Sequence, residues 1–178
     1  MYCAGHMIEA AIAYYTVTGK RKMLDAAIRL ANHIDSVFGP QKRLDVPGHE
    51  EIELALFKLY KATGEKKYLD LSSFFIDGRG NPNRMTAEKV SPPDKDANAN
   101  TPQRWRPPAY MQDHLPVTQQ FYAVGHAVRA TYLYTAMADI SMETNGVKYL
   151  PALDSLWNDV VYKKLFITGG VGTRQFHD

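Results

Sequence analysis

Three Gly-His pairs are the residues of this sequence best suited to chemistry, and they end in His6, His49 and His126. Each pair stands at or near the start of a stretch with an apolar helical pattern. Helix N-termini present free N–H groups and a positive dipole end, which suits an oxygen-rich ligand such as a sugar. We therefore predict these histidines as ligand-binding residues. The alternative is three buried histidines, each hydrogen-bonded to a backbone carbonyl.

A second candidate group is the tripeptide Gln112, Asp113 and His114, which precedes the third apolar helical stretch. Asp113 could hydrogen-bond sugar hydroxyls or orient His114, whose ring titrates near neutral pH. Because the tripeptide has the same placement as the Gly-His pairs, we predict all three residues as substrate-binding. Capping at the entry of a helix is the alternative role.

The acids and the single cysteine are assigned simpler roles. We interpret Glu50, Glu51 and Glu53 as acids that complement a helix dipole, and Glu9 as marking an exposed edge. Cys3 is the only cysteine, so a disulfide within the chain is excluded. A thiolate nucleophile needs an activating base, cation or metal, and a lone cysteine in an apolar stretch is usually a small buried hydrophobe. We expect no metal in this chain.

Paired helices of contrasting character must position these residues. Residues 4–15 are apolar on nearly all sides, as in a buried helix, whereas residues 21–37 are amphipathic. The pair recurs at 52–75 and at 121–160. Gly19, Gly64 and Asn145-Gly146 separate the two helices of each pair, and a glycine there predicts a left-handed C-cap.

A repeat of about 45 residues made of paired helices fits either an open solenoid or a closed toroid. The contrast between apolar first helices and amphipathic second helices favours the toroid, because an inner ring of helices is covered on both faces. The sequence therefore predicts an all-α fold in which helical hairpins form an (α/α) toroid or barrel.

Residues 78–118 interrupt the repeat with a long proline-rich loop. Such a loop in a compact domain is either functional or disordered. We expect residues 94–100 to be mobile and residues 105–117 to be ordered. Trp105 and Tyr110 could stack on a sugar face or simply anchor the loop.

Charge and hydropathy exclude two classes of partner. The net charge is +2 and the basic residues are dispersed, so we expect no nucleic-acid partner. No apolar run reaches transmembrane length, so we expect no membrane partner. The sequence leaves the compartment open between bacterial cytoplasm and periplasm or secretion.

Five segments together resemble glycoside hydrolase family 127, the β-L-arabinofuranosidase family. They are residues 2–10 (YCAGHMIEA), 46–56 (VPGHEEIELAL), 112–117 (QDHLPV), 123–130 (AVGHAVRA) and 167–172 (ITGGVG). The resemblance covers the whole chain in order. It implies an (α/α)6 barrel and retaining hydrolysis of terminal β-L-arabinofuranosides in oligosaccharides or glycoconjugates. It also implies a cysteine nucleophile held on zinc, a glutamate acid/base, and sugar contacts from His6, His49 and His126.

The sequence departs from the family where the reaction is performed. The family's acid/base glutamate and its zinc ligands follow the Gly-Gly-Val-Gly turn, and Cys3 does not match the nucleophile. We therefore expect residues 1–178 to be an internal fragment, about half of the ring, with part of the sugar pocket and no catalytic residue. We expect this chain alone to be inactive, and we expect a homo-oligomer to cover its open side.

Two other functions fit the same residues. One is another (α/α)6 sugar enzyme, such as an unsaturated glucuronyl hydrolase or a sugar epimerase. The other is a non-catalytic helical-repeat scaffold, which predicts scattered rather than convergent histidines. The distances among the three imidazoles distinguish a shared site from a scaffold.

Overall fold

The computed structural model describes residues 1–82 and 108–172, and these ranges contain six α-helices, two short 3-10 helices and no strand. The predicted all-α class is confirmed. Trp105 and residues 94–100 lie outside the described residues. The helices are α1 (Tyr2–Thr18), α2 (Lys22–Val37), α3 (Ile52–Thr63), α4 (Lys66–Gly78), η2 (Pro108–Met111), η3 (Val117–Gln119), α5 (Ala127–Thr144) and α6 (Leu150–Lys163).

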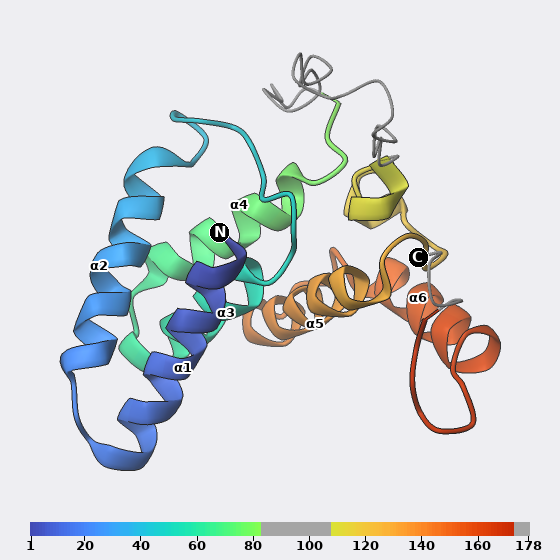
Figure 1. Ribbon diagram of the computed structural model, residues 1–178. Helices are drawn as coiled ribbons and strands as arrows, with labels where there is room; N and C mark the ends of the chain where they lie inside the picture. Colours follow the sequence, from blue (N-terminus) through green and yellow to red (C-terminus); the bar gives the residue numbers. More distant parts are fainter. Residues whose placement is uncertain (83–107, 173–178) are drawn as a thin grey trace, which may run out of the picture.

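The six helices form three hairpins of the (α/α)-barrel type. The first helices of the hairpins contact one another in order, α1 with α3 and α3 with α5, and each packs on its own second helix. The second helices α2 and α4 also touch. Figure 1 shows an arch in which α1 to α4 form one body, while α5 leads from that body to α6. An inner and an outer row of helices are thus both present.

Left-handed residues end the first helix of every hairpin. Gly19 (φ 67°) and Gly64 (φ 76°) do so as predicted, and their N–H groups donate to the carbonyls of Tyr15 and Tyr60 at 2.8 and 2.7 Å. In the third hairpin the left-handed residue is Asn145 (φ 49°), not the predicted glycine beside it. Asparagine tolerates this conformation because its short polar side chain can hydrogen-bond locally.

Two apolar clusters hold the hairpins together, and α3 contributes to both. One cluster joins α1, α2, α3 and α4, and includes Ile8, Leu24 and Leu56. The other joins α3 and α4 to α5 and α6, and includes Leu133 and Met137. Helix α3 therefore has the burial that was predicted for an inner helix.

Burial differs from the prediction on α1. Helix α1 was expected to be buried all round, yet Tyr14 and Val17 are exposed. Within the described residues α1 has neighbours on one side only, so its apolar residues are not all covered. On the amphipathic helix α2, Leu24 occupies the core and Met23 lies at the surface.

The third hairpin begins later than the apolar pattern suggests. A helix was expected from residue 121, but α5 begins at Ala127. Gly125 has φ 76°, and a Cβ there would lie 2.0 Å from the carbonyl oxygen of Ala109. Gly125 packs against Ala109 of η2, and the N–H of His126 donates to the carbonyl of Tyr110, so the backbone here leaves the helical path. No helix in the described part of the chain is long and apolar enough to cross a membrane.

Candidate functional site

Five aromatic and imidazole rings from three first helices and their entry loops form one cluster. Tyr2 lies between His6 and His49, with ring centroids 4.4 and 4.2 Å away. His49 lies 6.0 Å from His126, and Tyr132 faces His6 at 6.0 Å and His49 at 6.3 Å. The three imidazoles, 43 to 120 residues apart along the chain, are therefore brought into one cluster. A scaffold with scattered histidines does not have this geometry.

The three histidines hold different positions relative to their helices. His126 is the N-cap of α5, and its Nδ1 accepts from the N–H of Arg129 at 3.5 Å. His49 lies in the loop that precedes α3, whereas His6 is already within α1. Of the three, His126 therefore caps the N-terminus of a helix, while His6 lies in the second turn of α1, near the start of the helix as predicted. Packing of α1 on α3 brings His6 to the cluster.

One ring nitrogen of His49 contacts a backbone carbonyl. Its Nδ1 lies 2.5 Å from the carbonyl oxygen of Glu50, the type of contact expected for a structural histidine. Burial lowers the pKa of His49, and the positive charge of Arg129 acts in the same direction against the carbonyl contact. A neutral ring that donates through Nδ1 presents Nε2 as an acceptor.

Arg79 ties together the segments that carry His49 and His126. Its guanidinium is 1% exposed and donates to the carbonyls of Met111 and Pro47, both at 2.9 Å. It also lies 3.1 Å from Glu50 Oε1 and 3.2 Å from Glu53 Oε1. One buried side chain thus joins the loop before α3, the start of α3, the end of α4 and η2.

The three acids near the start of α3 are buried, and Glu53 lies in the first turn of the helix as the predicted dipole role requires. Helix α3 begins at Ile52, so Glu50 and Glu51 precede its first residue. Burial raises the pKa of Glu50 to about 7 against the opposing charge of Arg79. Glu53 Oε2 accepts from the N–H of Glu51 at 3.0 Å. Glu50 and Glu53 therefore contact Arg79 from another helix, in addition to lying near the start of α3.

The carboxyl group of Glu51 lies beside Gly5 and the imidazole of His6. A Cβ on Gly5 would lie 1.3 Å from Glu51 Oε2, so the carboxyl group occupies the space that glycine leaves. Nδ1 of His6 is 3.5 Å from Glu51 Oε1 and 3.9 Å from Glu9 Oε2. Burial, and then the neighbouring Glu9, raise the pKa of Glu51 to about 9.

Glu9 is kept ionised by the next helix. Burial acts to raise the pKa of Glu9, but hydrogen bonds with Lys58 on α3 and with Glu51, together with the charge of Lys58, outweigh it and lower the pKa below its ordinary value. Glu9 thus joins α1 to α3 and does not merely mark an exposed edge. His6, Glu9 and Glu51 form a group of nitrogen and oxygen donors whose nearest atoms lie within 4.8 Å of one another.

Cys3 is exposed on α1 and does not belong to this donor group, so the predicted burial is wrong. A zinc centre of the thiolate type is built from several cysteines. The sequence contains one. The residues of this chain therefore do not fit such a centre.

The predicted tripeptide of residues 112–114 contacts the backbone of His126 through Gln112. Gln112 is buried, and its Nε2 donates to the carbonyls of Val124 at 2.7 Å and His126 at 3.5 Å. Asp113 Oδ1 accepts from the N–H of Gly80 at 2.6 Å. Burial lowers the pKa of His114 against the charge of Asp113. The structure therefore brings Gln112 to His126, while Asp113 contacts the backbone that follows α4.

Sequence reasoning missed three contributors to the cluster. Tyr2 and Tyr132 supply the rings between the imidazoles, and Arg129 donates from α5 to the carbonyl of Gly48. The guanidinium of Arg129 also lies over the ring of Tyr110, 5.1 Å from its centroid. A charged residue in the first turn of an apolar helix was the available signal for Arg129. Tyr110 itself faces His126 at 5.4 Å.

Comparison with known proteins places this arrangement in a family. Residues 1–178 match the profile of the β-L-arabinofuranosidase GH127 catalytic domain. A non-reducing end β-L-arabinofuranosidase of Bifidobacterium longum subsp. longum is 39% identical over 175 residues, which are 97% of this chain and 26% of that protein.

Solved structures agree with the sequence match. A GH127 β-L-arabinofuranosidase from Geobacillus stearothermophilus T6 is 43% identical with a TM-score of 0.84, covering 98% of this chain and 27% of its own. A second GH127 β-arabinofuranosidase is 44% identical with a TM-score of 0.79, covering 98% of this chain and 24% of its own. The chain spans about a quarter of the length of these relatives. By sequence and by structure, it belongs to the GH127 β-L-arabinofuranosidase catalytic-domain family.

Proposed function

We propose that residues 1–178 form about half of an (α/α)6 ring and supply part of the sugar pocket of a β-L-arabinofuranosidase. The whole protein then hydrolyses terminal β-L-arabinofuranosides of oligosaccharides or glycoconjugates with retention of configuration. The convergence of His6, His49 and His126 around Tyr2 carries this proposal. The activity named for the Bifidobacterium relative supports the choice of substrate.

The ring cluster has the chemistry that a furanose requires. Neutral imidazole can donate from one nitrogen and accept at the other, which matches the hydroxyl groups of a sugar. Tyrosine adds an apolar ring face and a polar hydroxyl. His49 has Nε2 available because Nδ1 contacts a carbonyl. We propose that Gln112, Asp113 and His114 complete the wall of the pocket, with Gln112 fixing the backbone of His126.

The bond-breaking groups are proposed to lie elsewhere in the whole protein. Retaining cleavage needs a nucleophile and a proton donor on opposite sides of the anomeric carbon. Cys3 is exposed and does not belong to the donor group of His6, Glu9 and Glu51 found among the described residues. The zinc-bound cysteine and the acid/base glutamate implied by the family are assigned to the remainder of the protein. This chain alone is therefore inactive.

Two measurements test this proposal. The whole protein should release L-arabinose from an aryl β-L-arabinofuranoside, and His49→Ala or His126→Ala should raise KM or abolish turnover. The 178-residue chain should show no turnover with the same substrate. Turnover by the isolated chain would overturn the assignment of the catalytic groups, and unchanged kinetics of both variants would overturn the sugar pocket.

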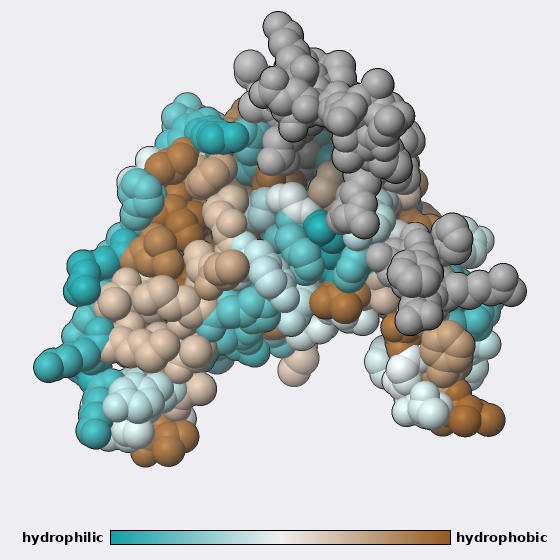
Figure 2. All heavy atoms as spheres, viewed as in Figure 1, coloured by the Kyte–Doolittle hydropathy of each residue, from teal (hydrophilic) through white to brown (hydrophobic). Residues whose placement is uncertain are grey.

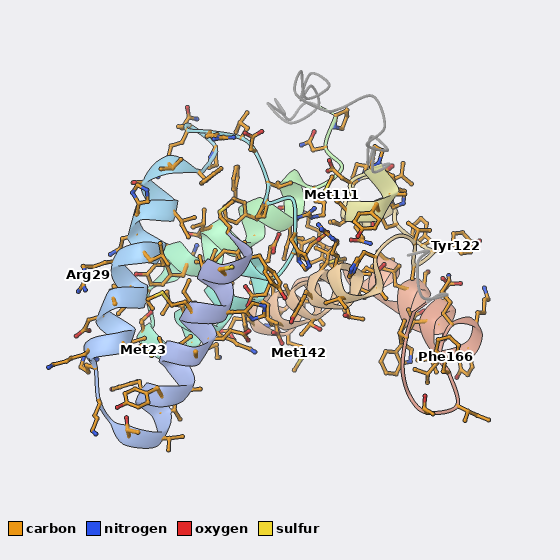
Figure 3. The ribbon with its side chains drawn as sticks, in the orientation of Figure 1. Met23, Arg29, Met111, Tyr122, Met142 and Phe166 are labelled. Atoms are coloured by element: carbon orange, nitrogen blue, oxygen red, sulfur yellow. The ribbon has the colours of Figure 1, made fainter. Side chains whose placement is uncertain are left out.

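The arm formed by α6 and the hairpin after it exposes apolar surface. Phe166 lies on this arm and is exposed, and the side chain of Tyr122, which precedes α5, points away from the α1–α4 body (Figure 3). Trp157, Tyr162 and Ile167 are also exposed. Figure 2 shows hydrophobic side chains at the tip of this arm and hydrophilic ones in the inner angle of the arch.

Exposed apolar patches of this kind promote association. We propose that the isolated chain forms a homo-oligomer through the arm. Light scattering that finds a monodisperse monomer would contradict this proposal.

A further inference from the structure

The strongest unassigned feature is the donor group under the ring cluster: His6, Glu9 and Glu51. Their donor atoms, the imidazole Nδ1 and one oxygen from each carboxylate, lie within 4.8 Å of one another. We infer that this group is a binding site for a divalent transition-metal ion. The site joins α1 to the start of α3, and it contains no thiolate.

The spacing of the donors suits a small divalent ion. Zinc with ligand distances of about 2.0–2.1 Å in tetrahedral geometry separates its donor atoms by about 3.4 Å. The imidazole Nδ1 of His6 already lies 3.5 Å from Glu51 Oε1 and 3.9 Å from Glu9 Oε2. Small side-chain adjustments therefore bring all three donors to one ion. A site with three protein ligands leaves a further position for water.

Burial of Glu51 is an independent pointer to a ligand. Its side chain is fully buried, and no hydrogen-bond donor among the described residues satisfies either carboxylate oxygen. A buried carboxylate is strongly unfavourable unless it is paired, protonated or coordinated, and the groups that face Glu51 here are the His6 imidazole at 3.5 Å and the carboxyl group of Glu9. The carboxyl group is aimed at His6 and cannot retreat toward α1, because it already occupies the space beside Gly5. A cation at the donor group would satisfy it.

The surroundings of the other two donors also fit a metal site. Lys58 binds Oε1 of Glu9, while Oε2 is the oxygen that faces His6, so one carboxylate serves both contacts. Metal-binding carboxylates commonly have such a supporting hydrogen bond. His6 uses Nδ1 toward the acids, and this leaves Nε2 for the ring cluster. The bound ion would fix the orientation of His6.

The chemistry of the donors selects the ion. One imidazole and two carboxylates suit Zn²⁺, Co²⁺ or Mn²⁺ better than Ca²⁺ or Mg²⁺, which prefer oxygen alone. The sequence predicts a chain without metal, because it contains a single cysteine and lacks the zinc ligands of the family, whereas the structure brings His6, Glu9 and Glu51 together. The inference concerns binding and does not depend on the proposed glycosidase activity.

Isothermal titration of the EDTA-treated 178-residue chain with Zn²⁺ tests the site. We expect one equivalent to bind, and Glu51→Gln and His6→Ala each to weaken binding by roughly 100-fold, since even loss of a supporting contact weakens metal sites 10- to 100-fold. His33→Asn, which changes an exposed histidine of α2, should bind as the parent chain does. Circular dichroism checks that each variant is folded. If Glu51→Gln does not fold, the zinc affinity of His6→Ala tests the site.

The optical spectrum of the Co²⁺-loaded chain gives a second readout. Bands in the visible region that His6→Ala abolishes would support nitrogen coordination by this residue. Binding that survives in His6→Ala, binding that His33→Asn removes, or no binding to the parent chain would each overturn the inference.

Discussion

Replacement of Arg79 by methionine tests whether one buried guanidinium holds the site-bearing segments together. Methionine keeps the length and apolar stem of arginine and removes its charge and donors. The carbonyls of Pro47 and Met111 then lose their donor, and the carboxyl groups of Glu50 and Glu53 lose their counter-charge. Removing one partner of a buried ion pair costs about 3–5 kcal/mol. The expected loss in the free energy of unfolding lies in that range.

Urea and thermal denaturation of the 178-residue chain measure the effect. For a chain of this size, Tm falls by about 2–4 °C per kcal/mol, so Arg79→Met should lower it by roughly 6–20 °C. The control is Arg21→Met, because the side chain of Arg21 is 56% exposed, forms an ion pair with exposed Asp25 and lies over the ring of Tyr15. Such a surface pair contributes about 0.3–0.5 kcal/mol. A loss below about 1 kcal/mol for Arg79→Met would refute the view that this residue joins the segments.

Three further changes test separate contacts. Gly5→Ala should destabilise the chain by about 1–3 kcal/mol, because the new Cβ overlaps the Glu51 carboxylate, while Gly172→Ala, whose Cβ meets no neighbour, should leave Tm unchanged. Burial acts to raise the pKa of Asp159, but Lys164 and the N–H of Ala123 outweigh it and lower the pKa. A depressed folded-state pKa contributes stability above the unfolded value of about 3.9, and this contribution is lost as pH falls through the folded pKa. The stability difference between the parent chain and Asp159→Asn in urea should therefore be full at pH 6 and shrink below pH 4; a constant difference contradicts the assignment. Tyr2→Leu should weaken binding of arabinose to the whole protein, measured by titration calorimetry, because it removes the ring between His6 and His49; unchanged affinity would exclude Tyr2 from the pocket.

Local features of the fold were predictable because they depend on residues close together in sequence. Helical periodicity located the three hairpins, and glycines marked the helix ends at Gly19 and Gly64. The start of α5 was not predictable, because residues 121–126 have an apolar pattern that also suits a helix. Their packing on η2, with Gly125 against Ala109, decides the backbone there.

Some features of the candidate site were likewise predictable from the sequence and others were not. The repeated Gly-His pairs indicated which imidazoles belong together, because equivalent positions of a repeat lie on equivalent parts of successive hairpins. The burial of Glu50 and Glu51, the partnership of Arg79 and the position of Tyr2 were not indicated. Each depends on a side chain that reaches a segment 26 to 47 residues away.

The sequence alone therefore determined the helical class, the hairpin repeat and the choice of three histidines for one site, since periodicity and repeated motifs depend only on the order of residues. Only the tertiary structure decided which acids are buried, which rings separate the imidazoles and which donors meet under His6. These properties arise when α1 packs on α3 and α3 on α5. Burial and charge pairing depend on which residues are neighbours in space, and the order of residues in a single sequence does not reveal those neighbours.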